Sequence, residues 1–343
     1  MQASRDEEPA LLAATRTGDE AAFGAVIERH RRELQVHCYR MLGSFEDSED
    51  LVQETFLRAW RSRTRFEGRS SPRTWLYRIA TNACLDALSR RPRRVLPPDV
   101  IPAADPSVIP APPASDLPWI QPYPDRLLEN LADSDAEPDA AVVSKETIEL
   151  AFIAALQHVP PRQRAVLIAR DVLGWSASEA ASLLEVSVAA VNSSLQRARA
   201  TLKQYLPPHR LEWARGEHPS QEEVSVLHQY MDALDRTDIS ALASLLRADA
   251  RMVMPPLAAW YDGRDAVLTA TNLGLSTLAS GSVRMIPTAA NRQPAVASYF
   301  RAQGESEHQA FILNVLRIEG GEIVEITGFP PELFAAFGFP PVL

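Results

Sequence analysis

The chain has 343 residues, 46% of them hydrophobic, and a formal net charge of −9, which suits two or three domains with cores of their own. No apolar run reaches the roughly 18 residues that span a bilayer, and the acidic first residues lack the basic and apolar regions of a signal peptide. We therefore expect a cytoplasmic protein without membrane segments. Cys38 and Cys84 have no metal-ligand spacing and are expected to be reduced, buried thiols, so neither a metal nor a cofactor is predicted.

Charge is distributed very unevenly over the first hundred residues. Residues 45–57 hold five acidic side chains and no basic one, whereas residues 58–94 hold eleven arginines against Glu67 and Asp86. Aromatic side chains are interleaved with these arginines, namely Trp60, Phe66, Trp75 and Tyr77. Because arginine neutralises phosphates and aromatic rings stack on unpaired bases, the basic stretch predicts a surface for partly unpaired nucleic acid. The acidic stretch would repel nucleic acid and is expected to face a different partner.

Residues 10–94 are predicted to form an all-helical domain. Asp19 can cap a first helix, which Gly43 and Ser44 interrupt. Asp47 or Ser48 can cap a second helix, and a third is expected over residues 73–90. The second helix buries Leu51, Val52, Phe56 and Trp60, and its opposite face presents Asp50, Gln53, Glu54 and Leu57 at spacings of three and four. Taken alone, such an acidic face is usually only a solvated helix surface.

Residues 95–139 are predicted to be an acidic, Pro-rich linker, mostly extended or disordered. Twelve prolines fall within residues 92–138, a composition that cannot bury enough apolar surface to fold alone. Residues 117–128 differ, because Trp119, Ile120 and Tyr123 are not needed in a spacer. This patch is either a docking segment or a chance apolar cluster in the tether.

Residues 140–208 are predicted to form a second helical domain that contains a helix-turn-helix. Ser176 and Glu179 have the spacing of a capping box that opens a short helix, and Ser187 can cap a longer helix reaching about residue 205. Two helices joined by so tight a turn are typical of DNA-binding motifs, including those of two-component regulators. The exposed face of the longer helix offers Asn192, Ser193, Gln196, Arg197 and Arg199.

Residues 219–335 are predicted to be an α+β domain. Helices are expected near residues 221–235 and 239–246, followed by strands that form a strongly curved antiparallel sheet. The expected strands are 251–254, 282–286, 295–300, 308–319 and 322–327. Gly320 and Gly321 between the last two are a hairpin signal.

Several of these segments resemble one known family. Residues 49–60 (EDLVQETFLRAW) resemble the helix by which bacterial sigma-70-type initiation factors bind core RNA polymerase, and residues 74–82 (TWLYRIATN) are similar to their promoter −10 helix. The helix-turn-helix resembles their −35 module. Two such modules without a domain between them match the extracytoplasmic-function (ECF) group. The Pro-rich segment 119–128 and the trailing domain, which is similar to SnoaL-like (NTF2-like) domains, indicate members with a C-terminal extension.

The resemblance implies a multidomain fold of two all-α sigma modules joined by a Pro-rich linker, plus a C-terminal α+β cone. It implies a non-catalytic initiation factor that melts promoter DNA with core polymerase. Residues expected to dock on the β′ clamp helices are Asp50, Gln53, Glu54, Leu57 and Arg58. Those expected at the −10 element, with the loop 66–71, are Phe66, Arg73, Tyr77, Arg78, Asn82 and Asp86. Those expected at the −35 element are Asn192, Ser193, Gln196, Arg197 and Arg199.

Two further expectations concern individual positions. Trp75 is assigned to the core, so Tyr77 and Phe66 are favoured for contact with bases. Many family members carry Lys or Arg where this chain has Asn192 and Ser194, which shifts the expected −35 affinity toward Arg197, Arg199 and Lys203.

The C-terminal domain is expected to regulate the sigma modules in cis, by packing on them or on the segment around Trp119. In the alternative, it binds or converts a small molecule in a pocket of the cone. The residues proposed to line that pocket are Tyr230, Met254, Trp260 and His308, with Met252, Tyr261, Asp262 and Phe311 as further candidates. His308 is the lone histidine of the later strands and would be the acid or base, but no titratable partner is evident from spacing.

Overall fold

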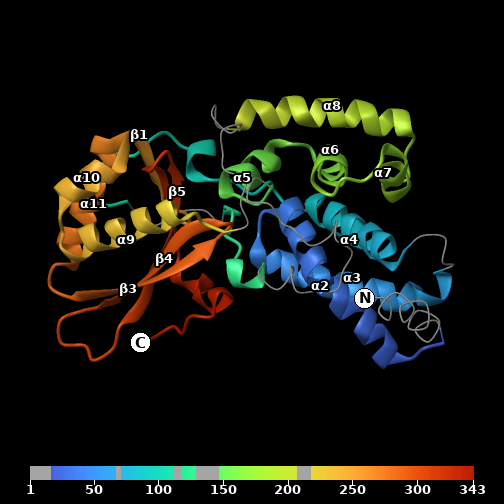
Figure 1. Ribbon diagram of the computed structural model, residues 1–343, viewed down its shortest axis with the longest axis horizontal. Coiled ribbons are helices and arrows are strands. Elements are labelled where there is room, and N and C mark those ends of the chain that lie inside the picture. Colours follow the sequence, from blue (N-terminus) through green and yellow to red (C-terminus); the bar gives the residue numbers. More distant parts are fainter. Residues whose placement is uncertain (1–16, 67–70, 111–116, 129–146, 207–217) are drawn as a thin grey trace. The chain divides into compact units, whose positions relative to one another are not determined.

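The computed structural model describes residues 17–66, 71–110, 117–128, 147–206 and 218–343 (Figure 1). It divides into two compact units. The first contains two helical modules, and the second contains Val95–Arg126, Ser144–Glu149 and Leu211–Leu343. No helix of the described ranges has both the length and the apolar content needed to cross a bilayer.

The first helical module consists of α2 (Glu20–Leu42), α3 (Phe45–Ser62) and α4 (Pro72–Leu88), with a short 3-10 turn at Arg63–Arg65. Asp19 caps α2 as predicted, since its carboxylate accepts the Ala22 amide at 3.0 Å. The predicted cap of α3 is wrong. The Ser44 hydroxyl accepts the Asp47 amide at 3.2 Å, so Ser44 is the cap and the helix begins at Phe45. Asp47 lies within the first turn of the helix. Ser71 caps α4, which opens on Pro72, a residue without an amide proton to satisfy.

Cys38 and Cys84 lie in the core of this module as free, fully buried thiols, as predicted. Leu34, Met41, Leu76 and Ala80 also have no exposed surface. The acidic residues of the charge reversal thus lie on α3, whereas the arginines are spread over α3, α4 and the segments that flank them. The inner faces of the helices make one apolar core.

The second helical module consists of α5 (Leu150–His158), α6 (Pro161–Leu167), α7 (Ala177–Leu184) and α8 (Val188–Tyr205). A π-helical turn at Ile168–Val172 follows α6. The predicted capping box is confirmed: Ser176 accepts the Glu179 amide and Glu179 accepts the Ser176 amide. Figure 1 shows α8 lying across α6 and α7, and it packs on both, as in a helix-turn-helix.

A buried arginine joins the two helical modules. Arg164 of α6 is 2% exposed, and its guanidinium donates to the Met41 carbonyl at the end of α2. It also donates to the side-chain oxygen of Gln157 at 2.6 Å and to the Gln157 and Val159 carbonyls at 3.0 and 3.1 Å. These acceptors replace the water that the charge loses on burial, so the arginine fixes the turn between α5 and α6 against α2.

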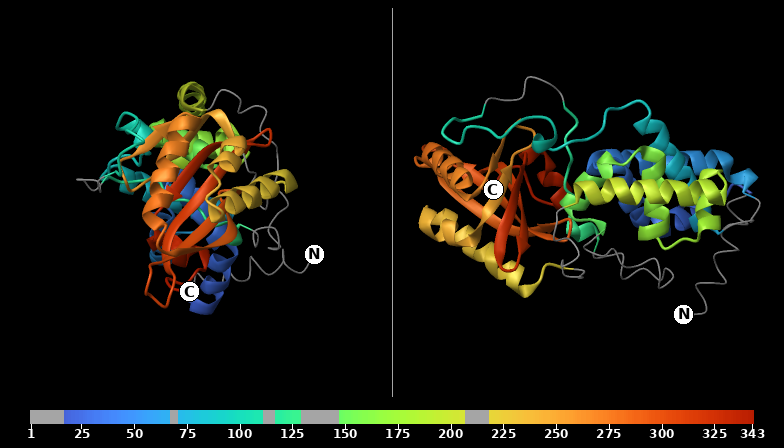
Figure 2. Two further views of the ribbon diagram at one scale, coloured as in Figure 1. Left: turned by 90° about the vertical axis from the view of Figure 1, so that its left-hand side faces the viewer. Right: turned by 90° about the horizontal axis from the view of Figure 1, so that it is seen from above.

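The C-terminal domain opens with α9 (Gln221–Asp235) and α10 (Ile239–Leu245), as predicted. Its six-stranded sheet, seen from two further directions in Figure 2, has the order β2-β1-β6-β5-β4-β3. The strands are β1 (Leu246–Val253), β2 (Trp260–Asp262), β3 (Ser282–Ala290), β4 (Gln293–Arg301), β5 (Gln309–Glu319) and β6 (Glu322–Phe329). A 3-10 segment, Pro331–Phe337, follows the last strand. The predicted α+β cone is confirmed.

Three details of this domain differ from the prediction. The short strand β2 was not expected. The sheet is mixed, because β1 pairs with β6 in parallel. A third helix, α11 (Arg264–Leu278), was missed. Its sequence contains Gly274 and three threonines, which are weak helix formers. Of its residues only Val267 is buried, so the apolar stripe that marks an amphipathic helix is faint. Helices α9, α10 and α11 share one core with the sheet, centred on Tyr230, Leu242 and Leu316.

The Pro-rich stretch contributes to the C-terminal unit. We call residues 95–110 and 117–126 the tether segments; they contain a 3-10 turn at Pro97–Asp99, and another turn begins at Asp125. Val95 forms an isolated bridge with Trp119, and Pro124 forms one with Ala290. The remainder of the predicted linker, residues 111–116 and 129–139, lies outside the described residues.

Candidate nucleic-acid interface and apolar pocket

The predicted polymerase-binding residues share one face of α3. Asp50, Gln53 and Leu57 are exposed, and Leu57 leaves 52% of its surface to solvent although it is apolar. Arg58 is half-buried and makes two ion pairs, with Glu54 at 2.7 Å on its own helix and with Asp86 of α4 at 2.8 Å. The face therefore combines carboxylates, an amide and an exposed leucine on a rigid helix, a composition suited to a protein partner.

The predicted −10 residues on α4, and Phe66 after the preceding 3-10 turn, are less accessible than expected. Tyr77 is 1% exposed and Phe66 is 7% exposed, whereas Trp75 is only half-buried. We predicted that Trp75 would be buried and that Tyr77 and Phe66 would be accessible, and the observed burial is the reverse. For Tyr77 the reason is a buried glutamate that sequence spacing did not reveal, and Phe66 packs against the Trp75 ring at 4.9 Å between centroids. Residues 67–70 of the adjoining loop lie outside the described ranges.

Glu33 of α2 holds the outer residues of α4. Its carboxylate accepts hydrogen bonds from Arg73 Nε at 2.8 Å and from Tyr77 Oη at 3.2 Å, and His30 Nδ1 lies 2.6 Å away. Although burial alone would raise it, the pKa of Glu33 is lowered because His30 and Arg73 stabilise the charged form. The Arg73 guanidinium also lies 5.1 Å from the centre of the Tyr77 ring. Arg73 and Tyr77 are therefore engaged within the protein.

The second helical module covers part of the same helix. The Trp175 ring meets the Tyr77 ring edge-on at 5.3 Å between centroids, and Arg78 donates to the Ser182 carbonyl of α7. Of the six predicted −10 residues, Asn82 and Asp86 are exposed. In this conformation α4 is thus closed to an incoming base at Tyr77 and Arg78.

The predicted −35 residues lie together on α8. Asn192, Ser193, Gln196, Arg197 and Arg199 are all exposed. Arg199 is paired with Asp171 through two contacts of 2.7 and 2.8 Å, whereas Arg197 has only a 3.3 Å contact with Ser194. A long helix with an exposed polar and basic face, preceded by a tight turn, has the geometry that enters a major groove.

A buried histidine near Tyr77 makes stability depend on pH. His37 is 1% exposed, and its Nε2 lies 2.9 Å from Thr81 Oγ1. Burial, together with the charges of Arg40 and Arg73, lowers the pKa of His37 to about 3. An unfolded chain takes up a proton below about pH 6.5 that the folded chain does not, so stability falls as the pH drops through that value, by up to about 1.4 kcal/mol per pH unit.

We expect His37→Gln to flatten this dependence. Glutamine can keep the contact with Thr81 but does not titrate, so the wild type should lose about 2 kcal/mol more than the variant between pH 7 and pH 5. Urea unfolding at the two pH values, followed by tryptophan fluorescence, measures both losses. Equal losses in the two proteins would contradict the assignment of a neutral His37.

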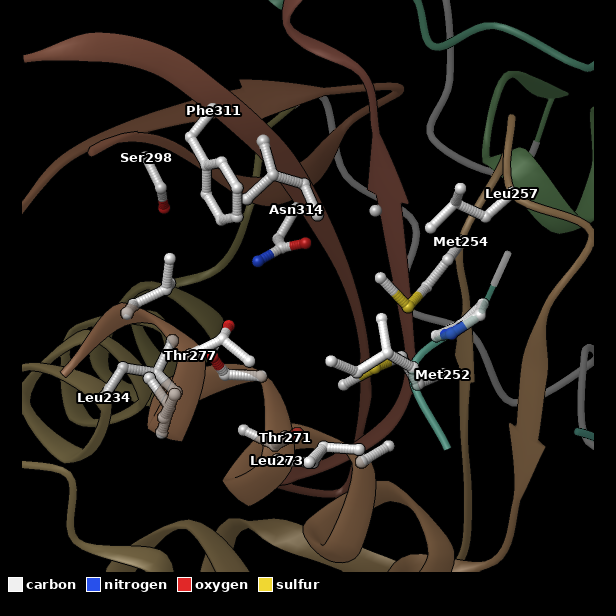
Figure 3. Close-up of a pocket in the computed structure, with 18 of the residues that line it drawn as sticks. Leu234, Met252, Met254, Leu257, Thr271, Leu273, Thr277, Ser298, Phe311 and Asn314 are labelled. Carbon is white, nitrogen blue, oxygen red and sulfur yellow. Dashed lines mark hydrogen bonds between the residues drawn. The ribbon is translucent and has the colours of Figure 1, made fainter. Parts of the chain in front are cut away.

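The C-terminal domain encloses an apolar pocket of about 280 Å³ (Figure 3). Of the residues predicted to line it, Tyr230 and Met254 do so, as do Met252, Tyr261 and Phe311. Trp260 and His308 do not. The indole of Trp260 donates to the Ile101 carbonyl at 2.9 Å, and His308 lies 3.0 Å from the Ser282 hydroxyl. Asp262 pairs with Arg251 at 2.9 Å instead of facing the pocket.

One wall of the pocket could not have been predicted from the sequence of the cone. Val108, Ile109 and Pro110 of the first tether segment line it together with α9, α11 and the sheet. Proline-rich linker residues carry no signal that places them at a cavity, because they belong to no periodic element.

Comparison with known proteins identifies the class to which these modules belong. The family description "Sigma-70 region 2" matches residues 26–94, and "Sigma-70, region 4" matches residues 149–202. The ECF RNA polymerase sigma factor SigG of Mycobacterium tuberculosis is 43% identical over 329 residues, which cover 95% of this chain and 85% of that protein. The chain belongs to the ECF sigma-70 family of RNA polymerase sigma factors.

Two further relatives agree with this assignment. SigM of Mycobacterium tuberculosis is 31% identical over 196 residues, covering 57% of this chain and 83% of SigM. The crystal structure of the extracytoplasmic-function sigma factor SigJ from the same organism aligns over 94% of this chain and all of that one, with a TM-score of 0.56 and 20% identity. The last comparison bears on the fold alone.

Proposed function

We propose that this sigma factor binds core RNA polymerase in the cytoplasm through α3, with Asp50, Gln53, Glu54 and Leu57 facing the β′ clamp helices. The observation that carries this proposal is the large exposed surface of Leu57 at the centre of an acidic face. An apolar side chain surrounded by polar groups that exclude water is typical of an interface anchor. Arg58 supports the face from behind by tying it to α4 through Asp86.

Promoter reading is assigned to α8 and α4. The exposed side chains of α8, above all Gln196 and Arg197, would contact base edges of the −35 element, and Arg199 would contact phosphates. On α4, Asn82 is accessible as the structure stands, whereas Tyr77 and Arg78 become available once Trp175 and Ser182 move away. Extruded bases captured by α4 would then offset the unstacking cost of a few kcal/mol per base.

A run-off assay tests this function. With purified core polymerase and a promoter selected from genomic fragments, we expect the full chain to direct initiation at one start site. Arg197→Ala should lower the yield about tenfold, in keeping with the 1–3 kcal/mol of one base contact. Gln204→Ala, also exposed on α8 but outside the predicted set, should have no effect. A chain that binds promoter fragments but not core polymerase would instead be a plain DNA-binding regulator.

The C-terminal domain is proposed to regulate the sigma modules in cis through the tether segments. These segments follow the first helical module and precede the second. Tyr123 within them is fully buried, and its amide donates to Asn291 of the C-terminal domain. A tether that is attached to the C-terminal domain cannot extend fully. It therefore limits how far the two promoter-reading modules can separate. Release of the tether would lengthen their reach.

A catalytic role for the cone is the weaker candidate. General acid–base chemistry needs a titratable group at the reacting atoms, and the lining residues that the structure describes include no Asp, Glu, His, Lys or Arg. His308, the residue proposed for this role, contacts Ser282 outside the pocket. The pocket is accordingly proposed to bind and not to convert its occupant.

A further inference from the structure

The apolar pocket of the C-terminal domain has the characteristics of a ligand site. Its volume of about 280 Å³ lies near the lower end of the roughly 300–1,000 Å³ of small-molecule pockets. Side chains of α9, α11 and the sheet form most of its wall, and the apolar members include Leu234, Met252, Met254, Leu273, Met285 and Ile312. Methionines adapt their shape to apolar ligands of different outline.

The lining selects against charge. None of the lining residues described is ionisable at neutral pH, so a charged ligand would lose its hydration without gaining a counter-ion. The polar groups are few and neutral. Asn314 donates to the Tyr230 hydroxyl at 3.3 Å, and Figure 3 shows its amide among apolar side chains inside the pocket.

One hydroxyl in this wall has no partner. Thr271 Oγ1 is buried and makes no hydrogen bond to any described residue. Buried hydroxyls are nearly always paired, and this one belongs to a residue that lines the pocket. The hydroxyl exposes almost no surface to the empty cavity, so a ligand oxygen or nitrogen would satisfy it after a rotation of the Thr271 side chain toward the pocket.

The tether completes the wall with side chains that are otherwise unfavourably exposed. Val108 leaves 57% of its surface to solvent and Ile109 leaves 60%, and Phe311 on β5 leaves 42%. All three line the pocket. The Ala104 amide donates to the Trp260 carbonyl at 2.8 Å, and the Trp260 indole donates to Ile101, so the tether is anchored to the domain just before these residues. A molecule in the pocket would cover apolar surface that now faces water.

We propose that the C-terminal domain binds a neutral, mainly apolar small molecule with one hydrogen-bonding oxygen or nitrogen, and that tether residues 108–110 form part of the binding site. A ligand in the pocket contacts both the tether and the rest of the C-terminal domain, so its binding strengthens the attachment of the tether to the domain. This proposal rests on the proposed cis regulation and adds a ligand that controls it. Its test is a binding measurement, so it stands or falls separately from promoter activity.

Prodan, a neutral aromatic ketone whose emission shifts to the blue in apolar surroundings, is a suitable probe. We expect the full-length protein to bind it saturably with one site per chain. Gly274→Leu should weaken binding at least about tenfold, a loss of 1.4 kcal/mol or more. Gly274 lines the pocket, and a Cβ added there meets no atom within 4 Å, so leucine occupies the cavity without displacing backbone.

Three further variants complete the test. Asn272→Leu adds the same side chain at an exposed position of α11 outside the lining and should bind as the wild type does. Thr271→Val keeps the shape and removes the hydroxyl, and should weaken binding a few-fold. The double variant Val108→Ser/Ile109→Ser should do the same if the tether is part of the site. Circular dichroism checks that each variant is folded.

Three results would overturn the proposal. One is the absence of saturable binding, and another is equal binding by Gly274→Leu and the wild type, which would place the probe elsewhere. The third is full affinity in the Val108→Ser/Ile109→Ser variant, which would remove the tether from the site.

Discussion

Replacing Leu57 by Asp should abolish binding of the protein to core RNA polymerase while leaving its fold intact. Leu57 is 52% exposed on α3, so the free protein loses little when it is changed. A carboxylate buried in an interface loses its hydration, and the leucine's apolar contact, worth about 1.5–3 kcal/mol, is lost as well. We expect the affinity for core polymerase to fall at least about a hundredfold, with run-off transcription falling accordingly.

The matched control is Val224→Asp. Val224 is a helical apolar residue with 37% exposure, placed on α9 of the C-terminal domain and remote in sequence from α3. It should retain full binding in the same native-gel or anisotropy assay. Normal affinity of Leu57→Asp would exclude this face of α3 as the polymerase contact, whereas Leu57→Ala, with no buried charge, should show a smaller loss.

Replacing Asn291 by Ala should release the tether and raise transcription. Asn291 occupies the β3–β4 hairpin turn, where it and Arg292 have positive φ values of 56° and 60°. Its side chain accepts the Tyr123 amide at 2.7 Å and donates to the Ile148 carbonyl at 2.6 Å, while the Arg292 amide donates to Asp125 at 2.8 Å. The single turn therefore fastens both the end of the second tether segment and the chain that leads into α5.

The expected effect of Asn291→Ala is large because three features are lost together. Two buried hydrogen bonds disappear, each leaving a partner unsatisfied at about 1–3 kcal/mol, and alanine is strained where asparagine tolerates a positive φ. We expect run-off transcription at limiting sigma concentration to rise severalfold. Asn272→Ala, at an exposed site of the same domain, should change nothing.

Trypsin provides an independent measure of the release. Arg126 is the only basic residue between positions 95 and 142, and its guanidinium donates to the Ala336 carbonyl at 2.7 and 2.9 Å. Faster cleavage at Arg126 in Asn291→Ala, without faster cleavage elsewhere, would show a freed tether. A freed tether with unchanged or lower transcription would contradict cis regulation by restraint.

Local signals in the sequence predicted most of the helices, although α11 was missed and the cap of α3 was misplaced. Ser176 with Glu179, Asp19 and the face of α3 follow rules that act over three or four residues, and the structure agrees with each. The hairpin between β5 and β6 likewise follows from Gly320 and Gly321, both of which have positive φ.

Long-range contacts account for what the sequence did not reveal. The buried Tyr77 hydroxyl donates a hydrogen bond to Glu33, 44 positions earlier in the sequence. No pattern within α4 predicts that partner. The parallel pairing of β1 with β6 joins strands about 75 residues apart. Trp260 follows the pocket residue Met254 closely in the sequence. Its indole N–H nevertheless donates to the Ile101 carbonyl of the tether, and its ring does not line the pocket.

The tether segments also determine how this domain can be exchanged between proteins. Ile120 and Tyr123 before the second helical module, and Ile148 at its entrance, are buried, and they belong to the same compact unit as the C-terminal domain. A deletion beginning near residue 210 would remove Asn291, which accepts the Tyr123 amide and donates to the Ile148 carbonyl. Along the sequence, the pieces of the C-terminal unit alternate with those of the sigma modules. A functional graft onto another sigma factor must therefore carry three separate pieces of chain, and gene fusion at the C-terminus alone would transfer an incomplete domain.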